Sequence, residues 1–388
     1  MTIKNTNIPT LRFAEFTDDW EVKKLGEIFQ IFNGYAFSSS QKTEFGILWV
    51  KIADVGIQEM EYGSLSYLPL DFKEKHKRFL LKNGDYVVAL TRPILNGSLK
   101  IARINNFFNN SLLNQRVGKI VSKNNTSFIY SFLQKSDLIK SIENNISGSD
   151  PPNLSPNEIN RIKFSIPTLP EQTKIANFLT AIDDKIQQLS EQKSLLEQYK
   201  KGIMQKIFSR EIRFKPDTNS EYPDWEEKSL GDVVQIKYGK DQKQVICENG
   251  LYPILGTGGE IGRTNDFLCS KPSVLIGRKG TIDKPVFMDT PFWTVDTLFY
   301  TEVFENTFPK WLFYQFQLIN WYLYNEASGV PSLSASTIYK ISINLPSLPE
   351  QQKIATFLTG IDEKIKGVKE RLEATKAYKK GLLQVMFV

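Results

Sequence analysis

Residues 169–209 read LPEQTKIANFLTAIDDKIQQLSEQKSLLEQYKKGIMQKIFS, and residues 348–388 read LPEQQKIATFLTGIDEKIKGVKERLEATKAYKKGLLQVMFV. The two stretches align without a gap at a constant offset of 179 positions (348 − 169), and roughly half of the aligned residues are identical. The likeness extends upstream, where PNLS at 152–155 resembles PSLS at 331–334. Self-similarity of this kind marks repeated structural units, so the chain is organised around an internal duplication.

Each copy is predicted to form one long helix. Pro170 and Pro349 suit a first helical turn, and Glu171 and Glu350 place negative charge near the positive end of the helix dipole. Apolar residues then recur three or four positions apart, which is typical of a heptad seam. The seam of the first copy is Ile175, Leu179, Ile182, Ile186, Leu189, Leu196, Ile203 and Ile207, and that of the second is Ile354, Leu358, Ile361, Ile365, Val368, Leu372, Leu382 and Met386.

The two seams are predicted to pack against each other as a coiled coil. The flanking faces are mostly charged, so each helix has a single apolar stripe to bury. An antiparallel pair is favoured, because a folded domain separates the copies and gives the chain room to return. At a rise of ~1.5 Å per residue, about 35 residues give a rod of ~50 Å.

The composition indicates a soluble protein of several domains. A chain of 388 residues is long enough for two or three cores, and a net charge of +6 is compatible with a nucleic-acid partner if the basic groups are clustered. No apolar run approaches the ~20 residues that span a bilayer, and the N-terminus does not resemble a secretory signal, so a cytoplasmic protein without membrane contact is predicted. Two cysteines, Cys247 and Cys269, argue against a disulfide framework or a cysteine zinc site.

The segments that precede the helices are also related to each other. A Trp-x4-Leu-Gly-acid motif begins at Trp20 in the first and at Trp225 in the second, an offset of 205 (225 − 20). The change of offset means that the two domains have drifted in length. The sequence therefore predicts four segments, which are a first domain at 1–168, a central helix at 169–209, a second domain at 210–347 and a C-terminal helix at 348–388.

Both domains are predicted to be mixed, so the fold class is α+β. Apolar runs that follow turn residues indicate buried strands at 86–90, 116–121, 273–277 and 298–300. Short helices are expected near 129–133 and 310–318. Each domain ends in an irregular loop and a strand, closing at Ile166-Pro167 and at Leu345-Pro346, before the long helix begins.

Two dissimilar domains, each followed by an LPEQxKIAxFL helix, resemble the specificity subunit of type I restriction–modification enzymes. The resemblance covers essentially the whole chain and is most specific in the helices, in Lys174-Ile175-Ala176 with Ile182-Asp183 and in Lys353-Ile354-Ala355 with Ile361-Asp362. The tryptophan motifs and the strands before the helices are also similar to that family.

The resemblance implies a DNA-binding subunit without catalytic activity or cofactors. Each domain would read one half of a bipartite, asymmetric site in double-stranded DNA, and the paired helices would set the distance between the half-sites. In this family the helices also dock modification subunits, here expected to be two, which carry the adenine methyltransferase chemistry. Restriction subunits would join through the modification subunits. The helix residues expected at the partner-binding surface are Ile175, Leu179, Ile182, Ile354, Leu358 and Ile361.

Basic and amide residues next to predicted strands are the candidates for DNA contact. Arginine can bind guanine O6 and N7 with two hydrogen bonds, and lysine can hold phosphate. Arg92 and Arg278 each follow a hydrophobic strand and open a glycine-containing loop, so we interpret them as equivalent positions. The candidates are Arg92, Asn96, Lys100, Gln115 and Arg116 in the first domain, and Tyr238, Lys240, Arg278, Lys279 and Lys284 in the second. The alternative for each is an ordinary solvated surface residue.

Motifs that suggest catalysis have simpler interpretations here. Asp150-Pro151-Pro152-Asn153 lacks the aromatic residue of the amino-methyltransferase loop, and the repeat aligns Pro152 with Pro331 in a shared loop before a strand. The glycines of residues 256–262 lack the spacing and the GK[S/T] ending of a phosphate loop, which favours turns. The single histidine, His76, lies in KEKHKR and is interpreted as a solvated surface residue. The sequence thus predicts no catalytic residue, metal site or cofactor.

A second shared feature lies late in both helices, where Lys200-Lys201-Gly202 matches Lys379-Lys380-Gly381. These lysines are interpreted as a solvated face or as partners of the helix dipole, with contact to DNA or to a partner subunit as the alternative. The tyrosines before them, Tyr199 and Tyr378, are predicted to be packing residues.

Two other classes of function compete with the DNA-reading subunit. One is a pseudo-dimeric coiled-coil scaffold whose domains bind protein or RNA, which the modest net charge leaves open. The other is a stand-alone methyltransferase or nuclease, which the missing cofactor and metal motifs disfavour. Selection of two short DNA motifs at a fixed spacing would distinguish the DNA-reading subunit from the scaffold.

Overall fold

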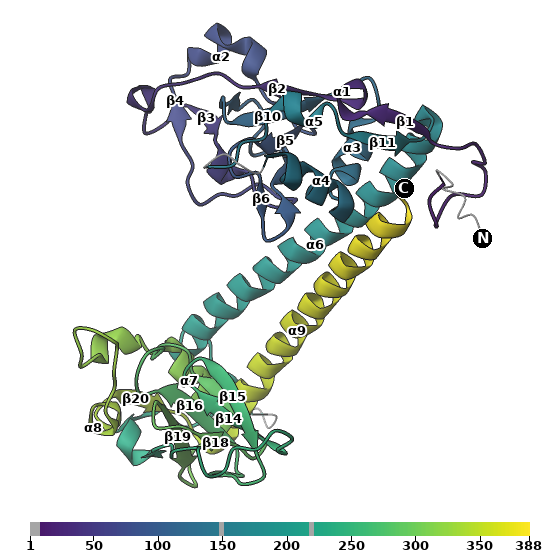
Figure 1. The fold of residues 1–388 in the computed structure, drawn as a ribbon. Coiled ribbons are helices and arrows are strands. Elements are labelled where there is room, and N and C mark those ends of the chain that lie inside the picture. Colours follow the sequence, from purple (N-terminus) through teal and green to yellow (C-terminus); the bar gives the residue numbers. More distant parts are fainter. Residues whose placement is uncertain (1–7, 147–150, 217–220) are drawn as a thin grey trace. The chain divides into compact units, whose positions relative to one another are not determined.

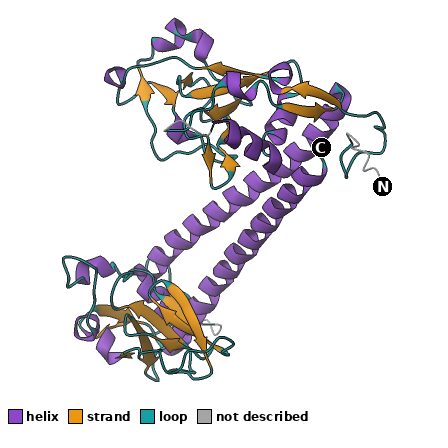
Figure 2. Cartoon of the chain, in the orientation of Figure 1, coloured by secondary structure: helices purple, strands orange, loops and turns teal. Residues whose placement is uncertain are grey.

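The computed structural model describes residues 8–146, 151–216 and 221–388, and the chain divides into two compact units. Unit 1 contains the residues up to Ser190 together with Arg371–Val388, and unit 2 is Glu191–Glu370. Each unit combines sheets with helices, as Figure 2 shows, which agrees with the predicted mixed domains.

The duplicated stretches form the two longest helices of the described chain, α6 (Leu169–Phe208) and α9 (Leu348–Val385) (Figure 1). The boundary between the units falls inside both helices, so each unit contains a part of each. In unit 1 the start of α6 lies in one hydrophobic core with the end of α9, and in unit 2 the end of α6 lies in one core with the start of α9. Within each unit the two helical segments therefore run in opposite directions.

The central sheet of unit 1 has the order β2-β10-β5-β8, and its paired strands are antiparallel. β1 pairs with β11, the strand that precedes α6. The remaining strands form two smaller sheets, β4-β3-β9 and β6-β7. The strands of unit 1 are β1 (Glu21–Lys24), β2 (Gln30–Asn33), β3 (Ile47–Val50), β4 (Tyr67–Leu68), β5 (Tyr86–Ala89), β6 (Ile94–Leu95), β7 (Ser98–Leu99), β8 (Ile101–Arg103), β9 (Leu112–Leu113), β10 (Val117–Val121) and β11 (Lys163–Ile166). Its shorter helices are α1 (Leu25–Ile28), α2 (Phe72–Lys75), α3 (Thr126–Phe132), α4 (Ser136–Ile146) and α5 (Pro156–Ile159), with 3-10 turns η1 (Ser39–Gln41), η2 (Ile52–Asp54) and η3 (Lys77–Phe79).

Unit 2 repeats this plan with the central sheet β13-β19-β16-β17. β12 pairs with β20, the strand that precedes α9, and β15-β14-β18 form a second sheet. The strands are β12 (Glu226–Ser229), β13 (Val234–Lys237), β14 (Tyr252–Gly256), β15 (Gly259–Thr264), β16 (Ser273–Gly277), β17 (Val286–Met288), β18 (Trp293–Thr294), β19 (Leu298–Val303) and β20 (Ser342–Leu345). The shorter helices are α7 (Pro309–Leu318) and α8 (Ala335–Tyr339), with 3-10 turns η4 (Leu230–Asp232) and η5 (Trp321–Tyr324).

The strands and short helices expected from the sequence are confirmed, with small shifts at their ends. β5 is buried along its whole length, which explains why its sequence is a continuous apolar run rather than an alternating one. The turn before it depends on Gly84, whose φ of 92° suits glycine, and on Asp85, whose carboxylate accepts a hydrogen bond from the Lys82 amide. Local signals of this kind place the central strands correctly.

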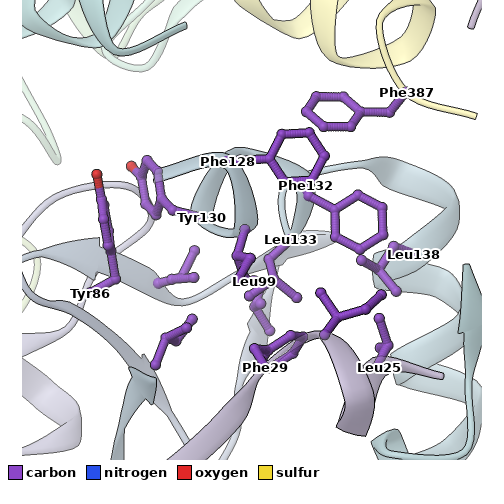
Figure 3. Close-up of a cluster of buried hydrophobic side chains, with 14 of the residues drawn as sticks. Leu25, Phe29, Tyr86, Leu99, Phe128, Tyr130, Phe132, Leu133, Leu138 and Phe387 are labelled. Carbon is purple, nitrogen blue, oxygen red and sulfur yellow. The ribbon is translucent and has the colours of Figure 1, made fainter. Parts of the chain in front are cut away.

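The core of unit 1 is rich in aromatic side chains (Figure 3). Phe387, just beyond α9, packs its ring 5.3 Å from that of Phe128 and 5.8 Å from that of Phe132, both on α3. Trp20 lies 6.3 Å from Phe387. Unit 2 uses the equivalent residue of α6, since Phe208 packs 6.3 Å from Trp225 and 6.1 Å from Trp311. Each unit therefore closes its core with the end of a repeated helix.

A repeated clasp fixes the first turn of each long helix to the opening of a domain. In unit 1, Arg12 donates two hydrogen bonds to the buried carboxylate of Glu171, at 2.7 and 2.8 Å, and the Trp20 indole donates a third at 3.2 Å. The hydrogen bond to Glu171 raises the pKa of Arg12. Glu171 and its equivalent Glu350 thus do more than complement the helix dipole.

The clasp of unit 2 repeats that of unit 1 residue by residue. Arg213 donates to Glu350 at 3.2 and 3.0 Å, and the Trp225 indole donates to the same carboxylate at 2.9 Å. A buried carboxylate that accepts three hydrogen bonds from an arginine and an indole is well satisfied. Both domains are therefore held to their helices by the same chemistry.

Candidate nucleic-acid interface

The ends of the central strands of unit 1 meet at one edge of the sheet. β2 and β5 both lie antiparallel to β10, so their carboxyl ends lie beside the start of β10. Backbone hydrogen bonds between the segments just beyond the strands continue the pairing. They run from the Tyr35 amide to the Leu113 carbonyl (2.9 Å) and from the Leu90 amide to the Arg116 carbonyl (2.9 Å). We call residues 33–35, 90–92 and 114–116 the strand-end edge of unit 1.

Unit 2 builds the same edge from β13, β16 and β19. The Lys240 amide donates to the Thr294 carbonyl and the Arg278 amide donates to the Thr297 carbonyl, both at 2.8 Å. Residues 238–240, 278–280 and 295–297 therefore form the strand-end edge of unit 2. The two edges share one backbone frame, although their side chains differ.

A glycine at the same place in both edges explains the close approach of two backbone segments. A Cβ atom on Gly34 would lie 2.2 Å from the carbonyl oxygen of Leu113, and one on Gly239 would lie 2.0 Å from the carbonyl oxygen of Val295. Only glycine allows the backbone to pass so close to a neighbouring carbonyl. The sequence therefore keeps this residue in both domains while the residues beside it change.

The shared frame corrects the predicted equivalence of Arg92 and Arg278. The Leu154 amide donates to the Leu90 carbonyl (2.6 Å), whereas the Leu333 amide donates to the Arg278 carbonyl (2.9 Å). Arg278 therefore occupies the place of Leu90. Arg92 corresponds to Gly280, because their amides donate to the carbonyls of Pro152 and Pro331. The two arginines lie in equivalent loops of the two units but two residues apart in register.

The candidates of the first domain lie on the strand-end edge, at the tip of a hairpin and, for Lys100, against a loop of the same domain. Arg92, Gln115 and Arg116 are exposed on the strand-end edge. Asn96 is exposed at the tip of the β6–β7 hairpin, where φ values of 50° at Asn96 and 70° at Gly97 make the tight Asn-Gly turn that such hairpins favour.

Lys100 differs from the other candidates because it is engaged by its own domain. Its Nζ donates to the Ile52 carbonyl at 2.7 Å, and burial lowers its pKa. Lys100 lines a cavity of about 500 Å³ that Glu59 and Glu61 also line. The ammonium group therefore holds a loop of unit 1 and is a weaker candidate for phosphate than the edge residues.

In the second domain, two candidates come into direct contact. The Arg278 guanidinium lies 5.5 Å from the centre of the Tyr238 ring, close enough for a cation–π interaction, and donates to the Asp296 carbonyl at 3.1 Å. Half of Tyr238 is exposed. Lys240 and Lys279 are exposed on the same edge, and Lys284 is exposed in the loop between β16 and β17. The unit 2 edge thus combines an aromatic face with several cations.

The sequence interpretation missed Tyr35 and misplaced His76. Tyr35 lies on the unit 1 edge, where its ring centre is 4.5 Å from that of His76 and 4.9 Å from that of Phe37. His76 is therefore half-buried in an aromatic cluster and not a solvated residue. The offset of 205 that relates the tryptophan motifs also relates Asn33-Gly34-Tyr35 to Tyr238-Gly239-Lys240, and this signal could have found Tyr35.

Exposed basic residues lie close to this aromatic cluster. Lys73 and Lys75 are on α2, and Lys77 and Arg78 follow in η3. A basic surface beside aromatic rings is typical of nucleic-acid contact, because cations hold phosphates and rings stack or pack on sugars and bases.

The helix residues expected to bind a partner are used by the chain itself. Unit 1 buries Ile175 and Leu179 in its core with Ile182 packed against it, and unit 2 buries Ile354, Leu358 and Ile361. Because these six side chains hold each helix to its own domain, a partner protein would have to contact other faces of the helices.

Two of the shared lysines form bridges between the helices, which corrects their interpretation as a solvated face, whereas Lys201 and Lys380 are exposed as predicted. In unit 1, Lys379 of α9 bonds Asp183 of α6 at 2.5 Å, and in unit 2, Lys200 of α6 bonds Asp362 of α9 at 2.7 Å. The offset of 179 relates both lysines and both aspartates. Burial lowers the pKa of Lys379 and raises that of Asp183. The bridges are therefore repeated contacts between the helical segments inside each unit.

The two tyrosines that precede these lysines are exposed, which contradicts the predicted packing role. Tyr199 is 52% exposed and Tyr378 is 57% exposed. They occupy equivalent positions of α6 and α9. The lysine that follows each tyrosine faces the other helix, and adjacent residues of a helix point in different directions, so each tyrosine lies on another face. Each unit thus presents one exposed tyrosine on a long helix.

Most residues of the motifs that suggested catalysis lie within the described part of the chain. Asp150 lies outside the described residues, whereas Pro152 and Asn153 run along the unit 1 edge as Pro331 and Ser332 run along the unit 2 edge. Among residues 8–146, 151–216 and 221–388, no group of three or more His, Cys, Asp or Glu side chains is placed to hold a metal ion. Within the same residues, no helix has the length and apolar character of a membrane span.

These features match one known family along most of the chain. The sequence profile of the type I restriction modification DNA specificity domain matches residues 17–198 and again residues 222–376. The chain therefore belongs to this family and carries two copies of its domain, which confirms the resemblance stated above.

Individual relatives agree with the family. The specificity subunit of the type I restriction enzyme MjaVIII from Methanocaldococcus jannaschii is 33% identical over 205 residues, which are 52% of this chain and 48% of that protein. The specificity subunit of EcoAI from Escherichia coli is 30% identical over 185 residues, 47% of this chain and 31% of that protein. The matched region thus spans about half the length of the first relative and about a third of the second.

A solved structure shows the same fold over the whole chain. The type I restriction–modification S subunit from M. genitalium matches with a TM-score of 0.69 at 17% identity, covering 98% of this chain and 99% of that one. At this identity the match concerns the fold alone.

Proposed function

We propose that this chain is the DNA sequence-specificity subunit of a type I restriction–modification complex, in which each domain reads one half of a bipartite, asymmetric site. The observation that carries the proposal is the duplicated strand-end edge. One backbone frame presents Tyr35, Arg92 and Arg116 in the first domain, whereas it presents Tyr238 and Arg278 in the second. A pair of readers with the same frame and different side chains would select two different half-sites.

The proposed binding mode follows from the chemistry of the edges. Exposed arginines can contact guanine in the major groove, and lysines beside them can hold phosphates. The β6–β7 hairpin with Asn96 at its tip is a further candidate, because the major groove admits a two-stranded ribbon. The candidates named from the sequence keep these roles in the proposal, with Lys100 as the weakest.

The paired helices would set the gap between the half-sites as a coiled-coil spacer. A rod of ~50 Å is long enough to hold two readers about one helical turn of DNA apart, which is ~34 Å. The repeated clasps and Lys–Asp bridges support this role, because the clasps fix each domain to the first turn of one helix and the bridges join the two helices at equivalent places in both units.

The chain itself would carry no catalytic group, and its complex would act in the cytoplasm. Two modification subunits would dock on the helices, and restriction subunits would join through them. The exposed Tyr199 and Tyr378 support two equivalent docking places, since each interrupts a charged helix surface with an aromatic ring.

The test is selection from a randomised duplex library by the full chain with its modification subunits, followed by mapping of the methylated adenines. We expect two short motifs at a fixed spacing. Inserting seven residues after Ser190 in α6 and seven after Glu370 in α9 keeps the faces of the helices, because seven residues are about two turns. It lengthens the spacer by ~10 Å, which corresponds to about three base pairs.

The half-sites themselves are the internal control for this experiment. Their bases should stay the same while the gap grows. An unchanged gap would refute the spacer role, and a complex indifferent to DNA sequence would refute the proposed function and favour a scaffold for protein or RNA.

A further inference from the structure

Gln115 and Asp296 occupy the same place in the two strand-end edges. The residue after each is fixed by an equivalent hydrogen bond, from the Leu90 amide to the Arg116 carbonyl and from the Arg278 amide to the Thr297 carbonyl. The residue before each is fixed too, because the carbonyls of Asn114 and Val295 accept from the first amides of β10 and β19, at 2.9 and 3.0 Å. Both side chains are exposed, and 69% of the Asp296 side chain is accessible. The frame therefore presents an amide in one domain and a carboxylate in the other.

These two side chains differ in what they can recognise. A glutamine amide both donates and accepts, which matches N6 and N7 of adenine in the major groove. An ionised carboxylate only accepts, and in the major groove the N4 amino group of cytosine is the donor that it reads. The same position of the fold thus carries chemistry for two different bases.

The surroundings of Asp296 make the carboxylate costly for DNA binding unless a base donates to it. Arg278 lies 3.9 Å from the Asp296 carboxylate, and Lys240 and Lys279 are exposed on the same edge. On this cationic surface the carboxylate repels phosphates and so weakens binding to every sequence. A base that offers an N–H group offsets this repulsion, which turns the charge into a source of discrimination.

Neighbouring groups hold the backbone of Asp296 in place. Arg278 donates to the backbone carbonyl of Asp296 at 3.1 Å and packs against the Tyr238 ring. The backbone at Asp296 is therefore anchored on one side by the strand pairing and on the other by a guanidinium. A fixed backbone limits the positions that the carboxylate can reach, and a positioned acceptor discriminates between bases better than a mobile one.

We propose that Asp296 is a specificity-determining residue of the second domain that accepts a hydrogen bond from the N4 amino group of cytosine, and that Gln115 reads adenine at the equivalent place of the first domain. This inference rests on the proposed function, because it assigns bases to positions of the DNA-reading edges.

The experiment compares Asp296→Asn and Asp296→Gln with the unaltered chain, each as the full chain with its modification subunits, by selection from a randomised duplex library. At one position of one half-site, the unaltered complex should prefer cytosine on one strand. Asn should relax this preference by about tenfold, the effect of losing one good base contact. Gln should shift the preference toward adenine, and both variants should bind non-specific duplex more tightly because a negative charge is removed. The other half-site should not change.

Asp289→Asn is the matched control. Asp289 is an exposed aspartate of the same unit that follows β17 at the opposite end of the central sheet, since Met288 pairs with Ser273 at the start of β16. This variant should leave both motifs unaltered. Gln115→Glu provides the reciprocal change, and it should move the preference at one position of the other half-site toward cytosine.

The outcomes separate this inference from the function on which it rests. If the unaltered complex selects two motifs and the Asp296 variants keep both of them, the base assignment is wrong while the proposed function stands. The assignment is equally wrong if Asp296→Asn relaxes a position that is not a cytosine. If the unaltered complex selects no motif, the proposed function itself fails.

Discussion

Replacing Lys379 by methionine should destabilise unit 1 far more than the equivalent change at Lys200 destabilises unit 2. Lys379 is the more deeply buried of the two repeated lysines, with a side chain 2% exposed against 16% for Lys200. Its ammonium group bonds Asp183 at 2.5 Å, Gln134 at 2.7 Å and Gln58 at 3.1 Å. Methionine keeps most of the apolar stem but none of these bonds.

The size of the effect follows from what is left behind. Removing one partner of a buried ion pair costs about 3–5 kcal/mol, because the other charge stays buried without compensation. The Asp183 side chain is 24% exposed, so water partly compensates its charge. We therefore expect the lower end of the range, about 3 kcal/mol. Asp362 is 33% exposed and keeps a hydrogen bond from the Tyr314 hydroxyl, so Lys200→Met should cost only about 1 kcal/mol.

Amide hydrogen exchange measured by mass spectrometry can follow the two units separately in one chain. Lys379→Met should reduce protection in the parts of α6 and α9 that belong to unit 1, by about a hundredfold in exchange rate if the local opening free energy falls by about 3 kcal/mol. Lys200→Met should change the corresponding parts of unit 2 by about tenfold or less.

A double variant shows whether the orphaned charge is the cause. Asp183→Leu combined with Lys379→Met replaces the ion pair by apolar side chains and should recover at least half of the lost protection. The reasoning is refuted if the double variant is no more stable than Lys379→Met alone, or if the Lys379 and Lys200 variants lose the same protection.

Two further predictions concern the repeated frame. Glu171→Gln keeps the shape of the clasp but removes the charge that Arg12 faces, so the free energy of unfolding of unit 1 should fall by about 2 kcal/mol. Chemical denaturation of this variant and of Glu350→Gln should give similar losses. No loss of stability in either variant would contradict the role of the clasp. Gly239→Ala places a Cβ 2.0 Å from the Val295 carbonyl oxygen and should cost about 2–3 kcal/mol. A library selection with this variant should show a weakened preference in one half-site only, and equal loss in both half-sites would argue against independent edges.

The sequence predicted the elements that depend on local periodicity. The long helices, β5, β16 and the strands before α6 and α9 all follow from spacing, caps and turn residues that lie within a few positions of one another. Even the antiparallel course of the helical segments within each unit followed from one fact, that a folded domain separates the copies.

The sequence could not place residues whose environment is supplied by distant segments. Lys379 looks like part of a solvated basic run, and only the folded chain brings Asp183 and Gln134 to it. Likewise, Arg92 and Arg278 both follow a strand, but their register depends on partner strands and on the loop before the long helix. In both cases the sequence showed the repeated residue types and not the contacts between them.

The duplication itself divides the residues of the chain into two kinds. Those that join a domain to a helix, or the two helices to each other, are the same in both halves. They include the arginine, glutamate and tryptophan of each clasp and the lysine and aspartate of each bridge. Those at the strand-end edges differ, except for the glycine that the backbone requires.

This division has a physical consequence for how the chain tolerates change. A clasp or bridge residue is buried or half-buried and bonded to a group far away in sequence, so its replacement costs stability. An edge residue such as Asp296 is exposed and contributes little to folding, so it can be exchanged without disturbing the frame. Under the proposed function, the recognised sequence could therefore diverge in one half-site while the fold, the helices and the other half-site stay intact.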